Sequence, residues 1–466
     1  MEKADREEQQ MRIQAYLELL KQDKLLYNAA EKTLEQYQDM ADRNYAALFA
    51  PALVEYVLWV LKDAAKSGIE RLYFLSRDAY PMYLVAKALT SGTSPELKTD
   101  IRYLRVSRYS LRMPEYHLLE EDSLDRIFLS GIDVSFYQIL RRADLDRDEM
   151  QQICEEIRYS RDLYDILNRA EILRLKEQVK EACRNGQCSL LRIIHRHSSA
   201  CYEDTIGYLT QEGMLEDIRY AVVDSGWVGT IQKSIQNLLA TRKPDICLYG
   251  YYFGLYELPQ DQSGCVYKAF YFMPHGNIYR KTRFSNCLYE VIYSEPCGMA
   301  KGYKKTEEGY EPVLSLILNP NRENLKKSEK VLQSYIRAVA EQPSLLQKEF
   351  SEEDKDAAKL TEQLYGRLMA HPSVWEAEYY GSLLFSDDLA DEHMRKTANE
   401  LTQKEIRDLR VLSKLKIMAG LSGKVIHESA WIEGTIVNGG EHITANLRSA
   451  HLAKALTHIR QSLKAK

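Results

Sequence analysis

AVVDSGWVGTIQKSIQNLL, residues 221–239, combines a short apolar run, a polar turn and an amphipathic segment. Val222 and Val223 predict a buried strand that leads into Asp224. The apolar residues after the turn recur at helical spacing, so a helix is expected there. A strand, a turn and a helix in this order form the repeating unit of an α/β protein with a parallel sheet.

The turn holds residue types that suit a phosphate or phosphate–metal site. Ser225, Gly226 and Gly229 are expected to form the turn, and Thr230 is expected to cap the helix. In open α/β sheets, ligands bind where the strands end, and the next helix N-terminus offers free N–H groups there. Asp224 is then a ligand-site carboxylate, or it hydrogen-bonds its own loop; a short glycine motif alone does not decide.

An earlier stretch, RLYFLSRDAYPM, repeats this design. Leu72–Leu75 predicts a strand, and Pro81 marks the first turn of a helix. Ser76, Arg77 and Asp78 lie between them. The arginine can hold a phosphate with paired donors, and the aspartate is a metal ligand, a base or the ion-pair partner of that arginine.

A further predicted strand, Ile101–Val106, also ends in a hydroxyl and a guanidinium. If the three strands are adjacent and parallel, their polar ends converge on one crevice. The residues expected to bind phosphate or substrate are Ser76, Arg77, Ser107, Arg108, Ser225, Gly226, Gly229 and Thr230. Asp78 and Asp224 are the expected catalytic residues and ligands of Mg²⁺.

The predicted fold class is α/β, with a Rossmann-like and mostly parallel sheet surrounded by helical regions. Pro51 is expected to open a buried apolar helix, and the segments 266–273 and 286–294 are expected as β-like runs. The predicted regions are an N-terminal helical region (1–68), a discontinuous α/β core (69–118 and 218–305), a helical insertion (119–217) and a C-terminal helical domain (306–466). The insertion is either a lid over the crevice or a packed accessory subdomain.

The composition narrows the class of protein. The 466 residues are 45% hydrophobic and 28% charged, as in folded multidomain proteins, and the net charge of −5 argues against nucleic-acid binding through bulk positive charge. None of the eight cysteines has CxxC spacing, which favours a reduced, cytoplasmic chain. The charged N-terminus is not typical of a signal peptide, and no apolar run suggests a membrane span.

Two other polar groups have ordinary structural interpretations. His195 and His197 lie two residues apart in a helical context, where an exposed pair is favoured over a metal site. Glu290 lies among apolar and aromatic residues. It needs a partner there, such as an arginine of the crevice, or it lies at a solvated edge.

Four motifs together resemble a family of bacterial proteins that occur with surface-polysaccharide biosynthesis genes and are described as predicted haloacid dehalogenase-like hydrolases. The motifs are YFLSRDAYPM (73–82), RYLRVSR (102–108), DSGWVGTIQ (224–232) and NCLYEVIYSEPCGMAKGY (286–303). The resemblance implies a hydrolase acting in that pathway. The chain has no early DxDxT-like loop, which phosphatases of that superfamily need for their nucleophile, although VVDS resembles their last acidic motif.

Phosphoribosyltransferases offer a second comparison. Asp224, Gly229 and Thr230 look like the loop that holds the ribose 5-phosphate in those enzymes, Arg77 like part of their first loop, and Arg108 like an arginine near a second strand end. The loop is shorter than usual here, and a serine replaces its second acidic residue. This comparison therefore implies phosphate binding more firmly than metal–ribose binding.

We therefore expect a cytoplasmic α/β protein that binds a phosphorylated sugar or nucleotide, as an enzyme of the hydrolase or transferase type in bacterial cell-surface polysaccharide biosynthesis. The alternative is a non-catalytic partner of a glycosyltransferase or polysaccharide assembly complex. The missing nucleophile loop and polar outer helices such as 323–340 favour that alternative. A phosphatase proper is a third hypothesis.

Overall fold

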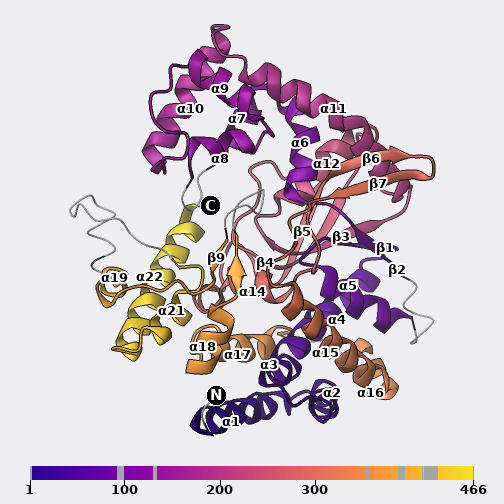
Figure 1. Cartoon of the computed structure of the whole chain (residues 1–466). Coiled ribbons are helices and arrows are strands. Elements are labelled where there is room, and N and C mark those ends of the chain that lie inside the picture. Colours follow the sequence, from indigo (N-terminus) through magenta and orange to yellow (C-terminus); the bar gives the residue numbers. More distant parts are fainter. Residues whose placement is uncertain are drawn as a thin grey trace.

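A five-stranded parallel sheet lies at the centre of the protein (Figure 1). The computed structural model describes residues 3–91, 99–129, 134–351, 356–386, 394–411, 413 and 429–464. The strands are β1 (Arg71–Leu75), β2 (Asp100–Leu104), β3 (Tyr220–Trp227), β4 (Leu248–Leu255) and β5 (Cys265–Phe272). Every pair of neighbours is parallel, which confirms the predicted α/β class with a Rossmann-like sheet.

The order of the strands fixes where a crevice forms. The sheet reads β2-β1-β3-β4-β5. The chain goes from β1 outward to β2, then crosses back past β1 to β3 and continues outward in the opposite direction. The connections therefore diverge between β1 and β3. In open α/β sheets, this switch point is where the carboxyl ends of the strands leave room for a ligand.

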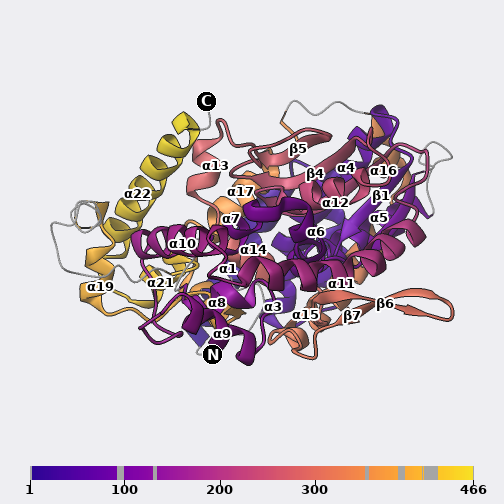
Figure 2. The same cartoon turned by 90° about the horizontal axis from the view of Figure 1, so that it is seen from above.

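Helices cover both faces of the sheet (Figures 1 and 2). On one face, Phe74 and Val223 share a hydrophobic cluster with α4 (Ala50–Lys66) and α5 (Tyr80–Thr90). On the other face, Leu75 and Val222 pack with α6 (Arg108–Leu119), α11 (Leu190–Gln211) and α12 (Thr230–Ala240). Successive strand side chains point to opposite faces, so strands buried on both sides read as continuous apolar runs. This is why β1 and β3 are recognisable in the sequence.

The N-terminal and C-terminal helices contribute to the same hydrophobic cluster as the first face of the sheet. Glu376 is fully buried in α18; it lies 3.0 Å from the Arg12 guanidinium of α1 and accepts a hydrogen bond from Tyr16 at 2.7 Å. This buried ion pair links α1 to α18. The helices of these regions are α1 (Lys3–Leu20), α2 (Lys24–Leu34), α3 (Met40–Asn44), α15 (Arg322–Ala340), α16 (Pro343–Ser351), α17 (Lys359–Leu368) and α18 (Val374–Gly381).

Pro51 lies in the first turn of α4, as predicted, although helical structure does not begin there. The chain is already helical from Met40 and stays helical to Lys66, with a π-helical turn, η1 (Tyr45–Phe49), just before the proline. A widened turn accommodates a residue that has no N–H to donate. By length and composition this helix is apolar enough to cross a membrane, but 89% of its apolar stretch of 18 residues is buried inside the protein.

The insertion between β2 and β3 is helical and has a hydrophobic cluster of its own, which extends from α6 to α11. Its other helices are η2 (Glu120–Asp122), α7 (Ser123–Ile127), α8 (Phe136–Arg141), α9 (Arg147–Glu156) and α10 (Arg169–Arg184). The hairpin of β6 (Ala300–Thr306) and β7 (Gly309–Leu314) lies against α11, where Tyr303 stacks on Tyr208 with ring centroids 4.2 Å apart (Figure 2).

Residues 286–294 are not a β-like run; they contain the helix α14 (Asn286–Ile292). Ser285 caps this helix, because its hydroxyl accepts a hydrogen bond from the Leu288 N–H at 3.2 Å. The remaining elements are α13 (Ile278–Thr282), β8 (Leu384–Phe385), β9 (Arg395–Lys396), α19 (Gln403–Asp408), α21 (Ile432–Asn438) and α22 (Ile443–Lys464).

Candidate functional site

The polar ends of β1 and β3 meet at the switch point. Asp78 follows β1, and Ser225 lies near the end of β3. The Ser225 hydroxyl donates a hydrogen bond to Asp78 Oδ2 at 2.9 Å. Two of the three predicted strand ends are therefore in direct contact.

Asp224 is a buried acid in this contact region, with 6% of its surface exposed. Its pKa is raised to about 8, mainly by burial and next by the nearby negative charge of Asp78; the Ser225 N–H and the positive charge of Arg108 act in the opposite direction. Its backbone carbonyl accepts a hydrogen bond from the Tyr56 hydroxyl at 3.1 Å, which fixes this part of β3 against α4. At neutral pH the Asp224 side chain is mostly protonated.

Glu290, on α14, is a third acid of the site, and it is absent from the predicted set. Trp227 Nε1 donates a hydrogen bond to Glu290 Oε1 at 2.5 Å. The pKa of Glu290 is raised to about 7, mainly by burial and next by the charge of Asp78; Arg108, the Trp227 hydrogen bond and Arg77 oppose this rise. An acid among apolar residues indicates that a partner is needed, but the sequence does not show that the partner is the indole of the DSGW motif.

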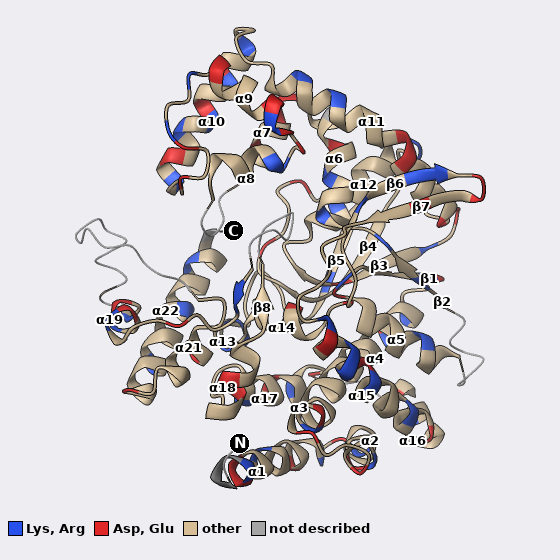
Figure 3. Ribbon diagram, viewed as in Figure 1, with Lys and Arg blue, Asp and Glu red and all other residues tan. Residues whose placement is uncertain are grey.

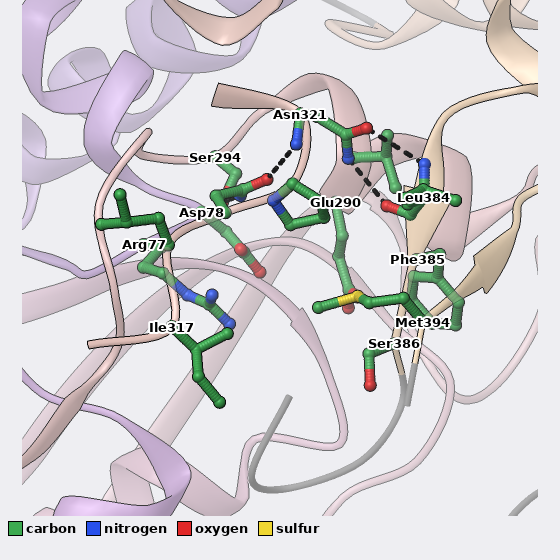
Figure 4. A pocket seen from close by; sticks show the side chains of 14 residues that line it. Arg77, Asp78, Glu290, Ser294, Ile317, Asn321, Leu384, Phe385, Ser386 and Met394 are labelled. Atoms are coloured by element: carbon green, nitrogen blue, oxygen red, sulfur yellow. Dashed lines mark hydrogen bonds between the residues drawn. The ribbon is translucent and has the colours of Figure 1, made fainter. Parts of the chain in front are cut away.

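A pocket with an empty volume of about 500 Å³, including its open mouth, lies beside these acids. Arg77, Asp78 and Glu290 are among its lining residues, and Figure 4 shows their charged ends pointing into the same space. The apolar lining side chains include Ile317, which lies beside Arg77, and Phe385; both belong to the predicted C-terminal domain. The site therefore combines charged and apolar lining residues, as small-molecule sites commonly do.

Asn321 fixes the position of Leu384, one of the residues that line the pocket. Its amide nitrogen donates to the Leu384 carbonyl at 2.7 Å, and its amide oxygen accepts from the Leu384 N–H at 3.0 Å (Figure 4). This pair of bonds joins the start of α15 to β8. The C-terminal part of the chain thus shapes the pocket, which no motif in the sequence indicates.

The predicted serines bond to the protein itself. The Ser76 hydroxyl donates to the Val106 carbonyl at 2.6 Å and joins the ends of β1 and β2. Ser107 caps α6 by accepting the Ser110 N–H at 3.0 Å, and it donates to the Ala300 carbonyl at 2.6 Å. Together with Ser225, these hydroxyls position the strand ends. A guanidinium, with its planar fork of donors, suits a phosphate better than a hydroxyl does.

The predicted turn at Ser225–Gly226 is wrong, because β3 continues to Trp227 and pairs with the end of β4. Gly226 has a φ of +124°, and a Cβ there would lie 2.0 Å from the Gly254 carbonyl oxygen. This glycine allows close packing of two strands.

Gly229, not Thr230, is the N-cap of α12. It has a φ of +69°, so the chain enters the helix through a left-handed residue and without a side-chain cap. Thr230 is the first helical residue, and its hydroxyl accepts a hydrogen bond from Arg112 Nη2 at 3.3 Å. The prediction of Thr230 as cap is therefore wrong, and the contact with Arg112 was not foreseen.

The acids alone do not form a complete metal site. Among the residues that the structure describes, no group of three His, Cys, Asp or Glu side chains is placed to hold a metal ion. Mg²⁺ is commonly bound by one or two carboxylates together with phosphate oxygens and water. Asp78 and Asp224 fit only that kind of site, in which a bound ligand completes the coordination. His197 contacts Glu149 at 2.9 Å, and His195 is exposed.

No protein-family model matches the chain, and no curated protein matches it either. The chemistry of the crevice is therefore what bears on function.

Proposed function

We propose that the protein binds a phosphorylated sugar or nucleotide in the crevice between β1 and β3, as a cytoplasmic enzyme of the hydrolase or transferase type. The observation that carries this proposal is the meeting of Arg77 with three acids, Asp78, Asp224 and Glu290, at the switch point of a parallel sheet. A role in cell-surface polysaccharide biosynthesis is supported by the motif resemblance alone.

The charges suit a phosphorylated ligand. A guanidinium offers a planar fork of donors that matches a phosphate, and Arg77 lines the pocket while Arg108 lies in electrostatic range of Glu290 and Asp224. The apolar lining residues, such as Ile317 and Phe385, suit the face of a base or a sugar. The phosphate would then contact the arginine, and the rest of the ligand would contact the apolar side chains.

The pKa values suit acid–base chemistry at neutral pH. A general acid or base works best when its pKa lies near the working pH, and Glu290 has a pKa of about 7. Asp224, at about 8, stays mostly protonated at that pH. We assign Glu290 as the acid–base group.

Mg²⁺, bound through Asp78 and Asp224, would stabilise negative charge on a phosphoryl group. Both residues must be ionised to bind it. Because Asp224 is mostly protonated at pH 7 in the free protein, binding of Mg²⁺ with a phosphorylated ligand is expected to release a proton. Calorimetry in two buffers of different ionisation enthalpy measures that release.

The test is calorimetric titration of the full chain, with Mg²⁺, against UDP-glucose and phosphoribosyl pyrophosphate as probes. We expect saturable binding of at least one probe, and an affinity at least about tenfold lower in Arg77→Ala, the loss expected for one hydrogen-bonded charge pair. The matched control is Arg174→Ala, which removes an exposed arginine of α10 and should bind as the wild type does. Absence of binding by both probes, or unchanged binding by Arg77→Ala, refutes the proposal.

A further inference from the structure

Arg112 is a buried cation without an acidic partner. It lies on α6, one helical turn beyond Arg108, and 9% of its surface is exposed. Its guanidinium makes one hydrogen bond, from Nη2 to the Thr230 hydroxyl at 3.3 Å. Within the described part of the chain, no carboxylate lies within ion-pair distance of it. A buried guanidinium with one neutral acceptor is costly unless an anion neutralises it.

The surroundings of Arg112 carry an excess of positive charge. Its pKa is lowered to about 10, mainly by burial, and the nearby cations Arg108 and Arg126 contribute to this decrease. Glu115 lies on the same helix, but its carboxylate already accepts hydrogen bonds from Ser234 at 2.5 Å and Asn237 at 2.6 Å. The nearest acid is thus engaged by α12 and is not paired with Arg112.

The N-terminus of α12 adds to this positive region. Thr230, which contacts Arg112, is the first residue of that helix, and no side chain caps it. The first N–H groups of a helix lack internal partners and attract anions. Figure 3 shows basic positions on α6 where this helix approaches α12. The Arg112 guanidinium and the N-terminus of α12 are therefore both suited to bind the same anion.

We infer that Arg112, Arg108 and the N-terminus of α12 form a second phosphate subsite, so that the ligand carries two phosphoryl groups. This inference rests on the proposed function, because it adds a second phosphate position for the same ligand. Arg108 connects the two parts: it lies in electrostatic range of Asp224 and Glu290 on one side and of Arg112 on the other. The ligand class is a diphosphate, such as a nucleoside diphosphate sugar or a sugar diphosphate, and not a sugar monophosphate.

The test is calorimetric titration of the full chain with pyrophosphate and, separately, with inorganic phosphate, both with Mg²⁺. The wild type should bind pyrophosphate at least tenfold more tightly than phosphate. Arg112→Met should lower the affinity for pyrophosphate at least tenfold. Arg112→Lys keeps the charge but loses the fork of donors, so its affinity should lie between those of the wild type and Arg112→Met. Arg174→Ala is again the unaffected control.

The outcomes separate this inference from the proposed function. If Arg77→Ala weakens pyrophosphate binding and neither Arg112 variant does, the second subsite is refuted while the proposed function stands. If both Arg112 variants weaken it and Arg77→Ala does not, the subsite is supported and the assignment of Arg77 fails. If the wild type does not bind pyrophosphate, the second subsite is refuted, and the titrations with UDP-glucose and phosphoribosyl pyrophosphate decide the proposed function separately.

Thermal unfolding without added anion distinguishes a binding role from a structural one. A buried cation whose anion is absent does not stabilise the free protein. The melting temperature of Arg112→Met should therefore be equal to or higher than that of the wild type. Pyrophosphate should raise the melting temperature of the wild type and leave that of Arg112→Met nearly unchanged. A lower melting temperature of Arg112→Met, with an equal rise on adding pyrophosphate, contradicts the inference.

Discussion

Replacement of Asp224 by asparagine is expected to stabilise the protein, by an amount that grows with pH. Burial raises the pKa of Asp224 to about 8, against about 3.9 for an aspartate in an unfolded chain. Between these two values, the native protein holds a proton that the unfolded chain has released. The free energy of unfolding of the wild type therefore falls as the pH rises across this window.

The magnitude follows from the width of the window. pH 7 lies about three pH units above the pKa of an aspartate in the unfolded chain. At about 1.4 kcal/mol per unit, the retained proton lowers the free energy of unfolding of the wild type by about 4 kcal/mol at this pH. Asparagine is neutral at every pH and has nearly the same shape, so Asp224→Asn avoids this deficit. The two proteins should be about equally stable near pH 4, and the difference should level off above about pH 8.

The assay is urea unfolding of both proteins at pH 5, 6, 7 and 8, with Asp148→Asn as the control. Asp148 is exposed on α9, and its replacement should change the free energy of unfolding by less than about 0.5 kcal/mol at every pH. A difference between Asp224→Asn and the wild type that does not depend on pH would refute the assignment of Asp224 as a buried, protonated acid. A loss of stability in the variant at pH 8 would refute it equally.

Gly226→Ala should lower the free energy of unfolding by about 3 kcal/mol or more, because it combines an unfavourable φ with a clash against the β4 backbone; Gly302→Ala, where a Cβ meets nothing within 4 Å, should cost about 1 kcal/mol or less in the same urea titration. Glu376→Ala should cost about 3–5 kcal/mol, because it leaves a largely buried guanidinium of α1 without its carboxylate, and a cost below about 1 kcal/mol would contradict this. The fluorescence of Trp227 should titrate with a midpoint near pH 7 as Glu290 ionises, and Glu290→Gln should abolish that step; a step that survives in the variant assigns it to another group.

The strands were predictable because burial on both faces leaves a direct mark on the sequence. The apolar runs that became β1, β3 and β5 were recognised, and the parallel order of the sheet brought the SRD and DSG residues together. The helix at 286–292 was misread because its aromatic and β-branched residues are typical of strands. Its cap at Ser285 and its packing against the sheet decide the local structure.

Other features of the site depend on tertiary contacts that local patterns do not contain. Gly226 looked like a turn glycine, but its role is set by the Gly254 carbonyl of the neighbouring strand. Thr230 looked like a cap, but the chain enters α12 through Gly229 in a left-handed conformation, and Thr230 is already helical. Arg112 lies inside a helix, and only the fold shows that it is buried without a carboxylate.

A crystal structure of the protein with Mg²⁺ and phosphoribosyl pyrophosphate or UDP-glucose tests the central claim most directly. We predict that phosphoryl oxygens lie about 2.8 Å from the Arg77 guanidinium, in the pocket lined by Asp78 and Glu290. A phosphorylated ligand bound away from the ends of β1 and β3, with this pocket unoccupied, would contradict the assignment of the crevice as the functional site.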